Sequence, residues 1–90
     1  MEIERKRMAD DGIAVAISGR LDAHWADQLD RELADVVREG TRRIRLDMGA
    51  IDYVSSAGIR ILVKYWKELR TITGSFRVVS PSANVRKILA

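Results

Sequence analysis

The sequence predicts an α/β fold with a four-stranded mixed, mostly parallel sheet flanked by helices, in the order β-β-α-β-α-β-α. Two observations lead to this prediction. Short segments of alternating apolar residues are separated by two longer segments with helical apolar spacing. Strands that alternate with helices are typically parallel neighbours joined by crossover helices. The chain has 90 residues, 47% of them hydrophobic, and this suits one domain over residues 1–90.

The first two strands are expected to form a hairpin. Ile3 and Arg5 begin a short strand, and the Asp-Gly pair at the end of Asp10-Asp11-Gly12 is typical of a tight turn. The second strand, Ile13–Ser18, alternates large apolar residues with Ala14 and Ala16. The large residues share one face of the strand, and the small Ala14 and Ala16 share the other. This pattern predicts that other elements pack closely on both faces.

A helix is expected from about Ala23 to Glu39, because its apolar residues recur at helical spacing. Asp22 is a good N-cap for it, and Gly40 suits a left-handed C-cap. Its apolar stripe consists of Ala26, Leu29, Leu33, Val36 and Val37. Strict alternation then predicts a third strand over Arg43–Met48, followed by a loop at Gly49–Asp52.

A second helix is predicted to begin at Ser55 or Ser56 and to end at Thr73-Gly74. Its apolar face is wider than one stripe: Ile59, Leu62, Val63, Tyr65, Trp66 and Leu69. A fourth strand is expected over Ser75–Val79. A turn at Ser80-Pro81-Ser82 then leads into a last helical segment that contains Val85, Ile88 and Leu89. We expect the domain to be short at its C-terminal end.

Composition excludes several classes of function. The net charge of +3 is mild and the basic residues are scattered among acids, so we expect no nucleic-acid surface. No apolar run approaches the ~20 residues of a membrane span, so no membrane insertion is expected. The chain has no Cys, which points to the cytoplasm. Asp22 and His24 supply two metal ligands where zinc needs three or four, and we expect neither metal nor cofactor.

The residues with the most chemical interest are the consecutive serines at the start of the second helix. If Ser55 caps the helix, the hydroxyl of Ser56 is left free in the first turn, and Ala57 and Gly58 add little bulk beside it. A phosphate there adds about −1.5 to −2 charge, which the positive end of the helix favours. The plainer interpretation is that the serines only cap the helix.

Ser56 could instead be a catalytic nucleophile with His24 and Asp22. A hydrolase elbow needs Gly two residues before the Ser, and Val54 occupies that position. We therefore expect no enzyme. Trp25, in an otherwise polar first turn, is not readily explained by the core and indicates a contact surface.

Four blocks of the sequence resemble one family. The stretch from Ile51 to Leu62 (IDYVSSAGIRIL) resembles the signature of STAS domains of the anti-sigma factor antagonist family. Gly19–Asp22 looks like the family's strand-to-helix turn, and Arg45–Met48 like its central strand. Ser80-Pro81 followed by Val85–Leu89 is similar to the pattern that opens its last helix.

The resemblance implies a phosphorylatable Ser at position 56, with Ser55 where the best-known members carry Asp. It implies that the unphosphorylated domain binds an anti-sigma factor, often itself a serine kinase, and releases it when phosphorylated; a phosphatase is a further partner class. The residues expected around the phosphate and the partner are Asp22, Ser55, Ala57, Gly58, Arg60 and Trp25. The alternative is a bacterial STAS module that is not phosphorylated and serves a transporter or a larger signalling assembly.

Overall fold

A computed structural model describes residues 2–79 of the chain. The elements are β1 (Glu2–Arg7), β2 (Ile13–Leu21), α1 (Ala23–Arg38), β3 (Arg43–Val54), α2 (Ser56–Thr71) and β4 (Ser75–Val79). They form one sheet in the order β1-β2-β3-β4. The β1–β2 pair is antiparallel, and the two other pairs are parallel. The predicted mixed sheet and the order β-β-α-β-α-β are confirmed, while the expected last helical segment lies outside the described residues.

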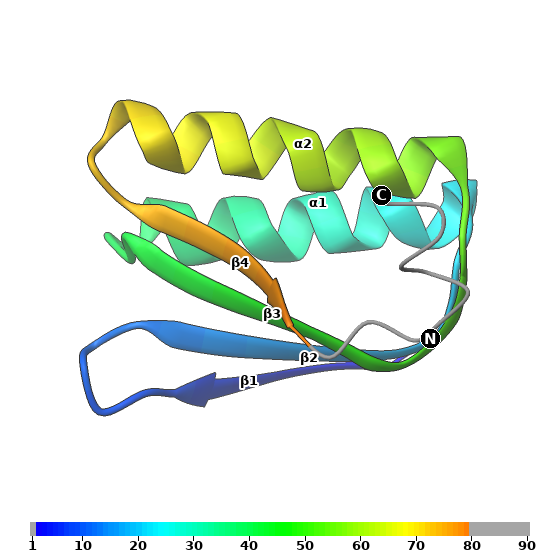
Figure 1. The fold of residues 1–90 in the computed structure, drawn as a ribbon, viewed down its shortest axis with the longest axis horizontal. Helices are drawn as coiled ribbons and strands as arrows, with labels where there is room; N and C mark the ends of the chain where they lie inside the picture. Colours follow the sequence, from blue (N-terminus) through cyan, green and yellow to red (C-terminus); the bar gives the residue numbers. More distant parts are fainter. Residues whose placement is uncertain (1, 80–90) are drawn as a thin grey trace.

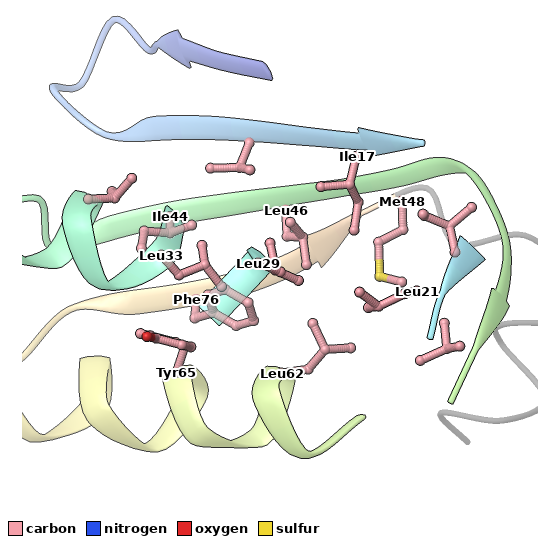
Figure 2. Packing of buried hydrophobic residues seen from close by; sticks show 14 of the residues in the cluster. Ile17, Leu21, Leu29, Leu33, Ile44, Leu46, Met48, Leu62, Tyr65 and Phe76 are labelled. Carbon is pink, nitrogen blue, oxygen red and sulfur yellow. The ribbon is translucent and has the colours of Figure 1, made fainter. Parts of the chain in front are cut away.

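Both helices cover the same face of the sheet, and the hydrophobic core lies between the two layers (Figure 1). Figure 2 shows large apolar side chains from β2 and β3 meeting those of α1 and α2. The sheet's other face has no covering element within residues 2–79, and Ala16 is exposed there. Packing on both faces of β2 is therefore wrong for the described part of the chain. Alternation identifies the residues that share a face, but it does not show whether anything covers that face.

The third strand differs most from the expectation. Gly49–Asp52 is not a loop, because β3 continues from Arg43 to Val54. β2 also continues to Leu21 and supplies the hydrogen-bonding partner, with Ser18 opposite Ala50. The register shifts between Ala16 and Ser18 and again between Gly19 and Arg20. Gly19 has φ of 99°, which a residue with a side chain rarely adopts. The two strands consequently end together, with Leu21 opposite Val54.

The helix boundaries largely follow the sequence signals. Asp22 caps α1, and Gly40 takes φ of 94° just beyond its end, as predicted. Thr73, with φ of 58°, follows the end of α2. The predicted apolar face of α2 is too wide, because Val63 and Trp66 are 43% and 45% exposed. The residues of that face that are buried are Leu62, Tyr65 and Leu69.

A polar contact between Tyr65 and Asp30 joins the two helices near their middles. The buried Tyr65 of α2 donates its hydroxyl to the backbone oxygen of Asp30 in α1 at 2.8 Å, and also contacts the Asp30 carboxylate. Lys64 reaches the same carboxylate at 2.9 Å. Burial raises the pKa of Asp30, but the hydrogen bonds from Tyr65 and Lys64 outweigh it and hold that pKa below its usual value. Burial and the nearby carboxylate raise the pKa of Tyr65.

Candidate functional site

The starts of the two helices lie next to each other at the edge of the sheet where β2 and β3 end (Figure 1). The last rung of the parallel pair places Leu21 opposite Val54. Beyond it, the backbone N–H of Ser55 donates to the backbone oxygen of Leu21 at 2.9 Å. This hydrogen bond joins the β3–α2 junction to the β2–α1 junction. The predicted site residues Asp22 and Ser55 therefore follow neighbouring strand ends.

Each junction has its own N-cap. Asp22 has extended backbone geometry, and its Oδ1 accepts from the backbone N–H of Trp25 at 3.0 Å. Ser55 has the same geometry, and its Oγ accepts from the backbone N–H of Gly58 at 3.2 Å. These bonds satisfy donors that a helix start otherwise leaves without a partner. The hydroxyl of Ser55 is thus engaged in the helix, as the sequence suggested.

Ser56 is the first residue of α2 and is exposed. Its hydroxyl has no hydrogen-bond partner among residues 2–79, in contrast to that of Ser55. It lies in the first helical turn, where unpaired backbone N–H groups favour negative charge. This hydroxyl is therefore accessible and lies at a position that accommodates an anion.

Gly58 is buried beneath Ser56, and its position depends on the absence of a side chain. A Cβ there would lie 2.8 Å from Cγ of Leu21 and 3.1 Å from the backbone oxygen of Leu21. Glycine therefore lets the first turn of α2 pack directly on the end of β2. Ala57 beside it is partly buried.

The other predicted site residues differ in exposure. Arg60 is exposed one helical turn beyond Ser56. Trp25 is half-buried against the core and meets the ring of His24 edge-on, with centroids 5.0 Å apart. Within residues 2–79, no hydrogen bond joins His24 to Ser56 or Asp22, and the Asp22 carboxylate is used by the cap. The geometry therefore offers no support for a catalytic triad of these three residues.

Two residues at this edge were missed by the sequence analysis. The guanidinium of Arg20 lies 4.3 Å from the ring centroid of Tyr53, in the rung before the last one of the β2–β3 pair. Both side chains are exposed. Their pairing depends on the continuation of the β2–β3 pair. Because a loop was predicted at Gly49–Asp52, the sequence did not indicate this pairing. The signal that was available is that each residue lies two positions before a predicted cap.

The described part of the chain shows no group of three or more His, Cys, Asp or Glu side chains placed to hold a metal ion. None of the helices within residues 2–79 combines the length and the apolar character needed to cross a bilayer.

Comparison with known proteins identifies the family. A model of the STAS domain matches residues 4–90. This chain belongs to the STAS domain family. The membership confirms the resemblance read from the serine doublet and the three other blocks.

Relatives of this STAS domain are named as anti-sigma factor antagonists. The Bordetella bronchiseptica protein named "Putative anti-sigma factor antagonist BtrV" is 38% identical over 79 residues, which cover 87% of this chain and 68% of that protein. The structure of an anti-sigma factor antagonist from Mycobacterium paratuberculosis matches with a TM-score of 0.81 at 25% identity. The match covers 98% of this chain and 75% of that one.

The fold is also that of Bacillus SpoIIAA, which has been solved in two states. The unphosphorylated form matches with a TM-score of 0.81 at 18% identity, covering 97% of this chain and 80% of that one. The phosphorylated form gives the same TM-score and identity, covering 98% and 80%. These matches confirm the predicted sheet-and-helix architecture of the STAS domain.

Proposed function

We propose that this STAS domain is an anti-sigma factor antagonist of the bacterial cytoplasm, which binds an anti-sigma factor with serine kinase activity through the surface around Ser56. Phosphorylation of Ser56 ends that binding. The observation that supports this most is the exposed hydroxyl of Ser56 at the first position of α2, beside a Ser55 hydroxyl already engaged in the cap. The names of its relatives support the same role.

The fold should tolerate the phosphate. The negative charge would lie in the first turn of α2, where the helix end stabilises an anion by roughly 0.3–2 kcal/mol. Arg60 lies four residues further along the same helix, at the spacing at which side chains share a face. The exposed position of Ser56 means that no buried contact is lost. Phosphorylation would therefore change the surface and leave the core intact.

The partner is where the phosphate has its effect. A protein docked over Ser56 would have to remove water from the new charge, which costs several kcal/mol without a matching cation. A loss of about 3 kcal/mol weakens binding more than a hundredfold. The reaction itself belongs to the kinase: the Ser56 oxygen attacks the γ-phosphorus of ATP, its proton leaves, and ADP is released. The STAS domain is the substrate and the ligand of that kinase.

Mass spectrometry tests the acceptor. The purified chain is incubated with ATP and each anti-sigma factor kinase encoded in the same genome, and its intact mass is measured. We expect one added phosphate, a shift of about 80 Da, located at Ser56 by peptide mapping and absent from Ser56→Ala. Ser55→Ala is the matched control, since it removes the neighbouring hydroxyl and should leave the shift in place. Phosphate on Ser55 would contradict the assignment.

Calorimetric titration of the same kinases tests the partner switch. Ser56→Ala should bind as the wild type does, and Ser56→Asp should bind much more weakly while keeping its melting temperature. If no kinase modifies or binds the wild type, the proposal is wrong. Recovery of a transporter or a multi-domain sensor in a pull-down, unaffected by Ser56→Ala and Ser56→Asp, would support the non-phosphorylated module instead.

A further inference from the structure

The face of the sheet that no element within residues 2–79 covers carries two bands of opposite charge. β-strand alternation directs Glu2, Glu4 and Lys6 of β1 to this face, and strand register aligns them with residues of the other strands. One rung runs Glu4, Ala16, Asp47, Val79, and the next runs Lys6, Ala14, Arg45, Arg77. We call Glu2, Glu4 and Asp47 the acidic band, and Lys6, Arg45 and Arg77 the basic band.

The two bands also differ in shape. The acidic band borders a hollow of about 390 Å³, whose floor is made by small residues that include Ala16, Gly49 and Ala50. The basic band consists of long, exposed side chains. One band is therefore a negatively charged hollow, and the other is a row of positively charged side chains of the kind that fills such a hollow.

The charges on this face are not paired with one another. Within residues 2–79, none of the six side chains of the two bands takes part in an ion pair. Arg45 lies directly opposite Arg77 in the sheet, and like charges in that arrangement are unfavourable. Acidic groups supplied from outside would relieve this repulsion.

We propose that this face binds a second copy of the same chain. A two-fold axis lying in the interface, across the strands and between the Ala14 and Ala16 rungs, brings Lys6 of each copy against Glu4 of the other. The same axis brings Arg45 of each copy against Asp47 of the other. The small Ala14 and Ala16 face each other at the centre and allow the longer side chains on both sides to meet. Such an interface is self-complementary, as a two-fold contact requires.

A second copy fits this face better than other occupants because both bands lie on one surface. A nucleic acid would meet the basic band but would be repelled by the acidic one, and an acidic peptide would leave the acidic hollow empty. A four-stranded face roughly 15–20 Å on a side is smaller than the ~800 Å² per partner of a standard stable interface. We therefore expect weak, concentration-dependent association.

The proposed pair leaves the candidate site accessible. The axis reverses the strand direction, so the edges that carry Ser56 point to opposite ends of the pair. The pair would present two Ser56 surfaces, each free to bind a partner. The inference does not depend on the proposed function, because it concerns a different face and is tested without any partner protein.

Sedimentation equilibrium of the 90-residue chain is the first test. At low ionic strength and rising concentration, we expect the average mass to increase from 10.2 kDa toward twice that value. In about 0.5 M NaCl, where charges are screened beyond about 4 Å, the mass should return to that of one chain. Wild-type protein that stays monomeric at low ionic strength up to millimolar concentration overturns the proposal. Salt-sensitive binding of poly-glutamate by such a monomer would indicate an acidic partner instead.

A charge-exchange experiment tests the pairing itself. Glu4→Lys with Asp47→Lys makes all four side chains that the axis pairs, at positions 4, 6, 45 and 47, basic. Lys6→Glu with Arg45→Glu makes all four acidic. Each variant alone should be monomeric, since like charges then face each other. An equimolar mixture should recover a species of twice the monomer mass. Circular dichroism confirms that both variants are folded, and a mixture that remains monomeric contradicts the proposed geometry.

The control uses charges on the other side of the molecule. Lys67→Glu with Arg70→Glu changes two exposed residues of α2 and should leave self-association unchanged. A competing contact would use the apolar groove lined by Leu62, Val63, Trp66, Phe76 and Val78. If Trp66→Ser abolishes self-association while the charge-exchanged variants still associate individually, the second copy binds at that groove and the proposal is wrong.

Discussion

The two strand-to-helix junctions are built alike but differ in what they leave available. At the first, Asp22 caps α1 by accepting from Trp25, and the next residue is Ala23. At the second, Ser55 caps α2 by accepting from Gly58, and the next residue is Ser56. Both helix starts satisfy a backbone donor, but the second adds an exposed hydroxyl that has no partner within residues 2–79. Capping thus explains one serine of the doublet and leaves the other for a different role.

The junctions also differ in how tightly they pack. At the third helical position, α1 has the half-buried Trp25, whereas α2 has the buried Gly58 against Leu21. A small residue is needed at the second junction because α2 lies directly on the end of β2.

Gly58→Val should have the largest effect on the second junction. Its Cβ would meet the side chain and the backbone oxygen of Leu21, and the backbone oxygen cannot move aside. We expect a loss of about 3 kcal/mol in the free energy of unfolding, at the upper end of overpacking costs. Arg60→Val is the control, because it places the same residue at an exposed position of the same helix. Urea unfolding that finds equal losses for both would show that packing on Leu21 is unimportant.

Tyr65→Phe tests the contact that holds α1 beside α2 away from the junctions. It removes the hydroxyl that donates to Asp30, and we expect a loss of about 1–2 kcal/mol. In the wild type, the lowered pKa of Asp30 stabilises the fold above its unfolded value, near 3.8, and this stability is lost as the pH falls further. The free energy of unfolding of Tyr65→Phe should therefore fall less than that of the wild type between neutral and acidic pH. Unfolding followed at several pH values measures this, and an unchanged pH dependence would contradict the role of Tyr65.

Asp22→Ala and Ser55→Ala compare the two caps directly. Each removes the side-chain acceptor of one helix start, and each should cost about 1 kcal/mol. Ser55→Asp should retain the stability of the wild type, since Asp caps as well as Ser does. Thermal unfolding of the three variants measures this. If Ser55→Ala costs nothing, the Ser55 hydroxyl is not the cap and the distinction between the two serines fails.

Ser56→Ala should have the smallest effect on stability. The hydroxyl of Ser56 has no partner within residues 2–79, so the free energy of unfolding should change by no more than about 0.5 kcal/mol. The same thermal unfolding series provides the measurement. A larger loss would mean that Ser56 stabilises the helix, which would reduce the contrast between the two serines.

The features that could be predicted are those set by neighbouring residues. The caps at Asp22 and Ser55 follow from side chains that bond to backbone groups three residues away. The last strand has the predicted bounds, Ser75–Val79, and the position of Gly40 follows from its tolerance of positive φ. The sequence predicted that Ser56 has an unengaged hydroxyl if Ser55 is the cap, and within residues 2–79 the structure shows this arrangement. Such signals are local, so a pattern of residues is enough to recognise them.

The register and the covering of the sheet were decided by contacts between segments distant in the sequence. Gly49–Asp52 has turn-like residues, yet pairing with β2 holds it in a strand because that ladder supplies its hydrogen bonds. The stacking of Arg20 on Tyr53 and the bond between Ser55 and Leu21 depend on that pairing. The two charged bands depend on the register of all four strands. The sequence by itself determined that two adjacent hydroxyls lie at the start of α2, where one of them can cap the helix. Only the tertiary structure decided that β2 and β3 pair as far as Leu21 and Val54 and place Arg20 and Tyr53 beside the helix starts. The physical reason is that a ladder of backbone hydrogen bonds can hold even a segment with weak strand propensity in a strand.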